Sequence, residues 1–361
     1  MNAQSEPNAT PEPQTAAVPT PPPGTTFTKK APPGAAPPGA QDDAATTRPD
    51  SATDGIGSLV IPANTASPLR HKKMVVVGFG ALGSHIALSL ALEGVELHII
   101  DDCRLNTYFA AAGWIAPYHA TDPRAGNWGL QSIEVWNALG EKFFPEGYVQ
   151  EELTMFERTR RAPRYPAEFA GLPGFRPVAK LGDGIAEAFT ARTLVAPAEL
   201  WHPFIRNLLA GMDNVTFHFR HVRDAAEMES LAAEFGADMV VDCIGVNEFE
   251  MYPDRMSDLM YGLVAHMKMP EGWHGGIRSR DTGIPHPGFS LPGGSADPYL
   301  ITQRSLRRIV VGGCMLPMTP AQTRALIESG YAVDEVLADE VITRAQKHFP
   351  ALRDLEVERL I

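Results

Sequence analysis

The sequence lacks the features that mark several large classes of protein. Its 361 residues contain only three cysteines, Cys103, Cys243 and Cys314, too few and too scattered for a disulfide framework or a zinc cluster. No apolar run reaches 18 residues, so no transmembrane helix and no membrane partner are predicted. Its 43 acidic residues outnumber the 31 basic ones, which argues against nucleic-acid binding through phosphates.

Two further absences concern targeting and metals. The first residues have neither the basic n-region nor the apolar h-region of a secretory signal, so we expect a cytoplasmic protein. The spacing of His119, His202, His266, His274 and His286 is not typical of metal ligands, and no metal site is predicted.

Aromatic residues are almost missing from the first 70 residues, where Phe27 is the only one. The same stretch holds 14 of the 32 prolines. Such a segment cannot bury enough apolar surface to offset the entropy lost on ordering. We therefore predict a disordered Pro/Ala-rich extension over residues 1–70 and a folded region over 71–361.

The folded region opens with a complete dinucleotide-binding pattern. A short β-branched run at 74–77 predicts a buried parallel strand, and it leads directly into the sequence GFGALG at 78–83. A helical stretch follows at 84–93, and then a second strand at 95–100 ends at Asp101 and Asp102. The strand, glycine turn, helix, strand and terminal acid together favour a βαβ dinucleotide fold.

Each residue of this pattern has a physical role in the prediction. Gly78 permits the tight turn, Gly80 allows backbone to approach a pyrophosphate, and Gly83 allows close packing of helix on strand. The backbone N–H groups of Ala81 and Leu82 belong to the helix N-terminus, which attracts phosphate. Either Asp101 or Asp102 is expected to accept hydrogen bonds from a ribose, with Asp101 continuing the strand most directly. The pattern alone does not separate FAD from NAD(P).

Further segments, in this order and spacing, resemble the D-amino acid oxidase family of FAD enzymes over essentially all of 74–361. They are AAG followed by PY at 111–118, NW at 127–128, FHFRHV at 217–222, ADMVVDCIGV at 237–246, DPYLI at 297–301 and IVVGG at 309–313. The AAG segment can also be understood as a small-residue packing site, and the 237–246 segment as a buried strand with a structural turn.

The resemblance implies an α/β fold, with a Rossmann-type FAD-binding domain and a mixed-sheet α+β substrate domain. The FAD-binding parts would be 74–120 and about 210–250. The substrate-domain parts would be about 121–209 and 251–330. Additional FAD-binding residues implied by the family are Ala112, Gly113, Val222 and Gly245, and Cys243 is expected to be a small core residue and not a nucleophile.

The resemblance also implies a chemistry. An amino acid would pass a hydride from its Cα to the flavin, and oxygen would then be the acceptor, giving a 2-oxo acid, ammonia and hydrogen peroxide. The cofactor carries this step, so the protein needs a carboxylate clamp and a dry face and no acid–base pair. Tyr299 matches a tyrosine whose hydroxyl holds the substrate carboxylate, and Tyr118 matches an active-site tyrosine near the lid.

Two elements of the family pattern have no match in the sequence. The arginine of the G-x-R-P strand is absent, because the chain ends just before it would occur, and Arg359 stands in a different context. The C-terminal GHGGxG turn is also absent. These absences keep open a truncated or catalytically inactive dinucleotide-binding relative. An NAD(P)-dependent dehydrogenase is a further alternative, although residues 140–200 are rich in Pro, Arg and aromatics and show no additional βαβ unit. The sequence does not determine the oligomeric state.

Overall fold

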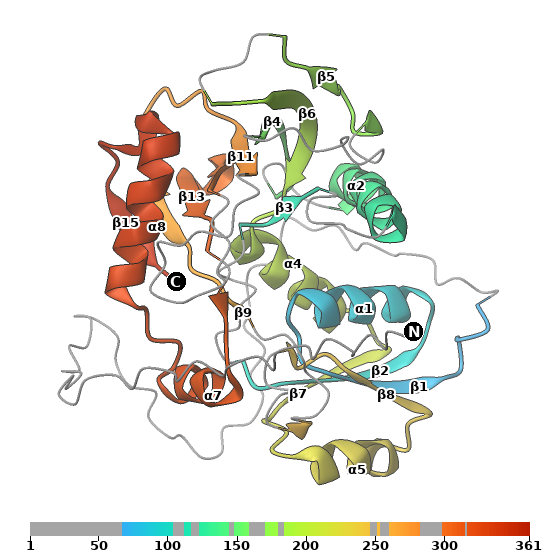
Figure 1. Cartoon of the computed structure of the whole chain (residues 1–361). Helices are drawn as coiled ribbons and strands as arrows, with labels where there is room; N and C mark the ends of the chain where they lie inside the picture. Colours follow the sequence, from blue (N-terminus) through green and yellow to red (C-terminus); the bar gives the residue numbers. More distant parts are fainter. Residues whose placement is uncertain are drawn as a thin grey trace, which may run out of the picture. The chain divides into compact units, whose positions relative to one another are not determined.

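A computed structural model describes residues 67–103, 112–116, 123–143, 148–158, 170–179, 184–245, 251–252, 260–281, 298–314 and 316–361. Tyr118 and nearly all of the predicted N-terminal extension lie outside the described residues. The described part contains two main sheets (Figure 1), one parallel and one mixed. This agrees with the predicted fold class, a Rossmann-type domain combined with a mixed-sheet α+β domain.

The parallel sheet has four strands in the order β7-β2-β1-β8. Its elements are β1 (Lys73–Val77), α1 (Ala81–Leu92), β2 (Glu96–Asp101), α4 (Ala198–Ala210), β7 (Val215–Phe219), α5 (Ala225–Phe235) and β8 (Met239–Asp242). Side chains alternate along a strand, so Met74 and Val76 pack toward α1 and α4, whereas Val75 and Val77 pack toward α5. Figure 1 shows α1 and α5 on opposite sides of this sheet. Burial of both faces explains why β1 is a continuous apolar run.

The mixed sheet follows the order β15-β10-β13-β12-β11-β4-β6-β3, and β5 pairs with β6. Its strands are β3 (Trp114–Ile115), β4 (Gln150–Arg158), β5 (Arg176–Pro177), β6 (Glu187–Val195), β10 (Ala265–Lys268), β11 (Ile277–Asp281), β12 (Tyr299–Gln303), β13 (Arg308–Gly312) and β15 (Val357–Leu360). The remaining elements are α2 (Pro123–Phe143), β9 (Met260–Tyr261), η3 (Arg304–Leu306), β14 (Leu316–Pro317), α7 (Pro320–Glu328), α8 (Glu335–His348) and η4 (Pro350–Leu352). Within the described residues, no helix combines the length and the apolar character needed to cross a membrane.

The two faces of the mixed sheet have different neighbours. On one face Met267, Leu300 and Val311 pack with residues of α8 and with Phe349. The opposite face carries a second apolar cluster, which we call the inner face; it comprises Ala112, Val195, Val264, Ile277, Ile301 and Val310. The first face is therefore an ordinary helix-on-sheet core, and the inner face is the one next to the Ala112–Gly113 segment.

The predicted boundaries hold closely where local signals are strong. The helix expected at 84–93 begins three residues earlier, at Ala81, because the glycine turn itself enters the helix. The strand expected at 217–222 runs over 215–219 instead, so that Val222 follows the strand and does not belong to it. Helix α8 is capped by the side chain of Asp334, which accepts from the backbone N–H groups of Val336 and Leu337.

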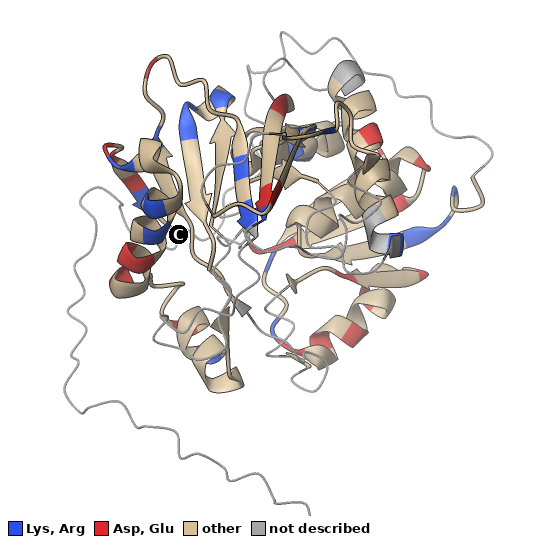
Figure 2. Cartoon of the chain, turned by 45° about the horizontal axis from the view of Figure 1, so that its top comes forward, with Lys and Arg blue, Asp and Glu red and all other residues tan. Residues whose placement is uncertain are grey.

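A buried ion network ties β4 to β11, which are parallel neighbours. The side chain of Glu157 is 2% exposed. It accepts from Arg278 at 2.5 Å and from Nε and Nη2 of Arg280 at 2.9 and 2.8 Å. Both guanidinium groups lie over the ring of Phe349, with their Cζ atoms 5.2 and 5.8 Å from the ring centroid. Acidic and basic segments accordingly lie next to each other among the strands of this sheet (Figure 2).

Candidate functional site

The carboxyl ends of the four parallel strands meet at one edge of their sheet. Gly78 follows β1, Asp101 ends β2, Val222 lies beyond β7, and Gly245 lies beyond β8. In open α/β sheets, ligands bind at this edge. Most of the residues that the sequence predicts for a dinucleotide therefore come together here from segments more than 160 positions apart.

The glycine turn has no room for larger side chains. Gly78 has φ +90°, and a Cβ at this position would lie 2.5 Å from the carbonyl oxygen of Cys243. A Cβ on Gly83 would lie well inside contact distance of the carbonyl oxygen of Gly78. The turn is thus held tightly between β1, α1 and the end of β8, as the sequence predicts.

The N-terminus of α1 is suited to an anion. Gly80 is its N-cap and has no side chain to cap the helix, and the first turn carries no acidic residue. The first backbone N–H groups, including those of Ala81 and Leu82, have no i−4 carbonyl partner within the helix. Leu82 is 63% exposed even though it is apolar. A phosphate-bearing ligand would satisfy the amides and cover part of this surface.

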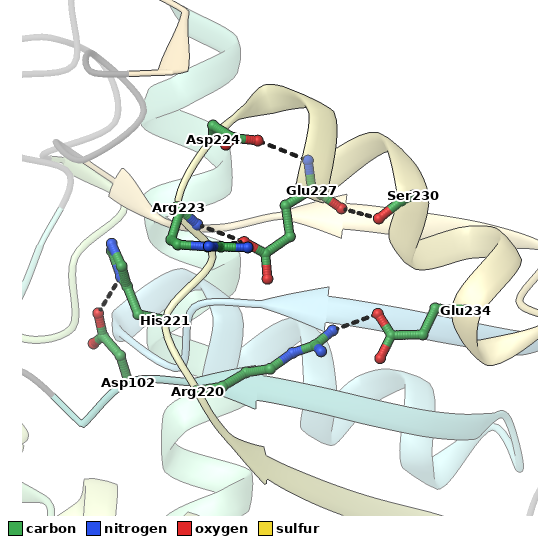
Figure 3. Close-up of polar contacts among 8 residues, drawn as sticks. All are labelled: Asp102, Arg220, His221, Arg223, Asp224, Glu227, Ser230 and Glu234. Carbon is green, nitrogen blue, oxygen red and sulfur yellow. Dashed lines mark hydrogen bonds and ion pairs between the residues drawn. The ribbon is translucent and has the colours of Figure 1, made fainter.

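The two acids at the end of β2, Asp101 and Asp102, have different partners. Asp101 bonds to Arg206 of α4 at 2.5 Å, and its other oxygen accepts from the backbone N–H of Phe79 at 3.4 Å. Asp102 contacts Nδ1 of His221 at 2.9 Å, as Figure 3 shows. Asp101 therefore reaches back to the glycine turn, which a ribose acceptor must do, whereas Asp102 faces the segment that follows β7.

The other residues drawn in Figure 3 come from the segment between β7 and α5 and from α5 itself. Arg220 pairs with Glu234 at 2.7 Å, Arg223 pairs with Glu227 at 3.0 Å, and Asp224 caps the helix. Val222 is buried in the core shared by β1, β2 and α5, so only its backbone is free to meet a ligand. Gly245 adopts φ +65° in the turn after β8.

The Ala112–Gly113 segment connects the parallel sheet to the inner face. The carbonyl oxygen of Ala112 accepts from Nε2 of Gln303 at 2.8 Å, and that of Gly113 accepts from the backbone N–H of Ala196 at 2.8 Å. Gly113 has φ +70°, and a Cβ there would collide with the carbonyl group of Ala196. This segment is therefore small because the backbone of the β6–α4 junction passes directly over it.

Tyr299 lies on the inner face, packed against its apolar cluster. It pairs across the sheet with Ser279 on β11 and with Gly312 on β13, where its ring occupies the space that a larger residue would fill. Burial raises the pKa of the Tyr299 hydroxyl to about 12, so it stays protonated at neutral pH. The buried hydroxyl of Ser279, its neighbour on β11, has no hydrogen-bond partner among the described residues.

Burial also makes two of the thiols poor nucleophiles. The pKa values of Cys243 and Cys314 are both raised to about 11, chiefly by desolvation. Cys243 and Cys314 therefore behave as small core residues, as expected for Cys243. Within the described residues, no group of three or more His, Cys, Asp or Glu side chains is arranged to hold a metal ion.

Sequence reasoning missed two residues of α4 that contact the residues predicted to bind the cofactor. Nε2 of His202 lies 2.6 Å from the carbonyl oxygen of Phe79, inside the glycine turn, and Arg206 binds Asp101. The two side chains are four positions apart and so lie on one face of α4. No motif marks them; the only signal in the sequence is the i,i+4 spacing of His and Arg in an amphipathic helix.

His266 is a buried titratable residue on the inner-face side of β10, paired across the sheet with Val310 and with Arg359. Its Nε2 is buried and has no partner in the described part of the chain. Burial, followed by the charges of Arg308 and Arg359, lowers its pKa from 6.5 to about 4. The folded protein therefore holds this imidazole neutral.

We expect this histidine to make the protein less stable in mild acid. In the unfolded chain the imidazole of His266 binds a proton below about pH 6.5, whereas in the folded chain it binds one only below about pH 4. The free energy of unfolding therefore falls between these values, by at most about 3 kcal/mol, and levels off below them. Urea unfolding at several pH values gives the free energy of unfolding at each pH. Between pH 4 and 6.5 this free energy should depend less on pH in His266→Leu than in wild type. The control is a substitution of the exposed His274, His274→Leu, which should keep the wild-type pH dependence. An equal pH dependence of the unfolding free energy in both variants would contradict the prediction.

The parallel sheet, its tight glycine turn and the acid at the end of β2 define a dinucleotide-binding protein. Residues 73–359 match the DAO family, described as FAD dependent oxidoreductase. The chain belongs to this family, whose members depend on FAD, so the NAD(P)-dependent alternative is set aside. The tight glycine turn and the uncapped N-terminus of α1 fit the pyrophosphate of FAD.

Solved structures show the same fold. L-amino acid deaminase from Proteus vulgaris is 13% identical with a TM-score of 0.57, covering 82% of this chain and 84% of the other. Iminodiacetate oxidase from Chelativorans sp. BNC1 is 14% identical (TM-score 0.55; 80% and 81% covered), and glycine oxidase from Bacillus cereus ATCC 14579 is 15% identical (TM-score 0.53; 80% and 81% covered). No curated protein matches the chain in sequence.

Proposed function

We propose that this chain is an FAD-dependent amino acid oxidase, which converts an amino acid, oxygen and water into a 2-oxo acid, ammonia and hydrogen peroxide. The observation that carries the proposal is the inner face: an apolar cluster that includes Ala112 and packs against Tyr299, whose hydroxyl is kept protonated by burial. Three proteins with this fold are named for the oxidation or deamination of iminodiacetate, glycine and L-amino acids, which supports the choice of substrate class.

In this proposal the dinucleotide is held by the edge of the parallel sheet. Gly78, Gly80 and Gly83 let the pyrophosphate approach, the amides of Ala81 and Leu82 donate to it, and Asp101 accepts from the ribose. The backbone around Val222 and Gly245 borders the adenosine end. Ala112 and Gly113 border the flavin, because they are the small residues between this edge and the inner face.

The substrate would then lie between the flavin and the inner face. When bound, FAD supplies the acceptor for the hydride of the substrate Cα and passes the electrons on to oxygen. The protonated hydroxyl of Tyr299 donates a hydrogen bond to the substrate carboxylate, and the apolar side chains exclude water from the reacting carbon. Tyr118, which lies outside the described residues, is proposed as a second substrate contact.

Anaerobic reduction of the flavin tests this function directly. We expect D- or L-amino acids, or glycine, to bleach the 450 nm band of the FAD-loaded protein, roughly where oxidised flavins absorb. Bound FAD that no amino acid reduces would contradict the oxidase proposal and favour a non-catalytic relative.

Tyr299→Phe provides the matching test at the substrate site. It keeps the ring over Gly312 and removes only the hydroxyl. We expect the apparent Kd of the reducing amino acid to rise about tenfold, since a hydrogen bond to a charged group contributes about 1.5–3 kcal/mol. FAD affinity should stay the same. Tyr148→Phe, whose ring packs against Phe204, is the control, and an unchanged amino acid Kd in Tyr299→Phe would remove Tyr299 from the site.

A further inference from the structure

Helix α4 contacts the nucleotide site at two separate points. His202 bonds to the carbonyl group of Phe79 in the glycine turn, and Arg206, one turn later, bonds to Asp101 at the end of β2. Burial lowers the pKa of His202, so the neutral ring donates from Nε2 to this carbonyl oxygen. One helix face therefore fixes the turn and the terminal acid relative to each other.

The guanidinium group of Arg206 is held in one orientation by its surroundings. It lies over the rings of Phe79, Phe217 and Phe219, at 5.4, 5.9 and 5.8 Å from their centroids. Its Nη1 also reaches the sulfur of Cys103 at 3.4 Å. Because a planar guanidinium stacked on aromatic rings loses little further freedom when it binds a carboxylate, Arg206 is preorganised for Asp101.

The ion pair is partly withdrawn from water. The side chain of Asp101 is 11% exposed and that of Arg206 is 28% exposed. A carboxylate offers about four acceptor positions. Arg206 takes one on Oδ2, and the backbone N–H of Phe79 makes a long contact of 3.4 Å to Oδ1. Positions remain for ribose hydroxyls. Without Arg206, Asp101 would keep only weak partners among the described residues: this long contact and the thiol of Cys103, whose sulfur lies 3.6 Å from Oδ2.

We propose that Arg206 is a positioning residue for FAD binding: it fixes the Asp101 carboxylate in the orientation that accepts the hydroxyls of the adenosine ribose. This inference rests on the proposed role of Asp101 as ribose acceptor. Arg206 itself does not touch the reacting atoms. Its effect is confined to the adenosine end and should be visible as a change in which nucleotide the protein prefers.

The test compares FAD with an FAD analogue whose adenosine lacks the 2′ and 3′ hydroxyl groups. Affinities are measured by the quenching of flavin fluorescence. We expect wild type to bind FAD at least tenfold more tightly than the analogue. Arg206→Ala should bind FAD about tenfold less tightly, equal to about 1.4 kcal/mol, and should discriminate between the two ligands by less than threefold. Arg206→Lys should restore only part of the preference, because an ammonium group lacks the planar fork.

Arg220→Ala is the matched control. Arg220 also pairs with a carboxylate, Glu234, and also lies over an aromatic ring, Phe235, but it does not contact Asp101. It should keep the wild-type affinity and discrimination. If Arg206→Ala does not fold, Arg206→Met, which keeps the apolar stem over the rings, takes its place.

Two results would overturn the proposal and are distinguishable from each other. An Arg206 variant that keeps the full wild-type preference for the ribose hydroxyls shows that Asp101 needs no positioning by this residue. A wild-type protein that binds FAD and the analogue equally removes Asp101 from the ribose site, and the role of Arg206 with it. Neither result bears on the reduction of the flavin by an amino acid, which tests the oxidase proposal separately.

Discussion

Replacement of Gly83 by alanine should abolish stoichiometric FAD binding. The new Cβ would overlap the carbonyl oxygen of Gly78, which belongs to the backbone and cannot rotate away as a side chain does. Either α1 moves away from β1 or the glycine turn opens, and both changes displace the helix amides from the phosphate position. We expect the FAD affinity to fall about 100-fold or more, which corresponds to about 2.7 kcal/mol. The strain should lower the free energy of unfolding by about 1–3 kcal/mol.

Gly211→Ala is the control for this substitution. Gly211 has a φ of −84°, and a Cβ there would make only ordinary contacts, at 3.5 Å or more. Flavin fluorescence titration and urea unfolding of both variants should show wild-type behaviour for Gly211→Ala alone. A Gly83→Ala protein that binds FAD as wild type does would show that the turn does not hold the pyrophosphate.

Neutralising the buried Glu157 should lower the free energy of unfolding much more than neutralising an exposed carboxylate of the same sheet. Glu157→Gln removes the negative charge between Arg278 and Arg280 without changing the side-chain volume. Two partly buried cations then face each other with no counter-ion. Breaking a buried pair in this way typically costs about 3–5 kcal/mol, because the remaining charge is uncompensated.

Glu151→Gln on the same strand separates burial from charge. Glu151 forms an exposed pair with Arg192 on β6. An exposed pair contributes about 1 kcal/mol or less. Urea unfolding should therefore give a much lower midpoint for Glu157→Gln than for Glu151→Gln, with similar m-values. Equal midpoints would mean that the network around Glu157 contributes no more than a surface ion pair.

The sequence predicts best what depends on neighbouring residues. The first strand, the glycine turn and the second strand follow from β-branched runs, glycine spacing and a terminal acid, and each lies within a residue or two of its predicted bounds. Helix α8 also begins at a local signal, because the side chain of Asp334 caps its N-terminus.

Contacts between distant segments could not be predicted in the same way. The partners of Glu157 lie on a strand more than 120 positions away, and their alignment depends on the register of β4 with β11. Arg206 meets Asp101 only because α4 packs on α1 beside the parallel sheet. The family resemblance pointed to Tyr299 as a site residue. That Ser279, Tyr299 and Gly312 lie side by side across three strands could be seen only from the register of the sheet.

The most direct test of the account is a titration of the purified full chain with FAD, followed by its visible absorption spectrum. We predict one FAD per chain and flavin bands near 370 and 450 nm, roughly the usual values, that remain with the protein after desalting. A folded, colourless protein that retains no FAD would contradict the central claim that this glycine turn and Asp101 form a working FAD site.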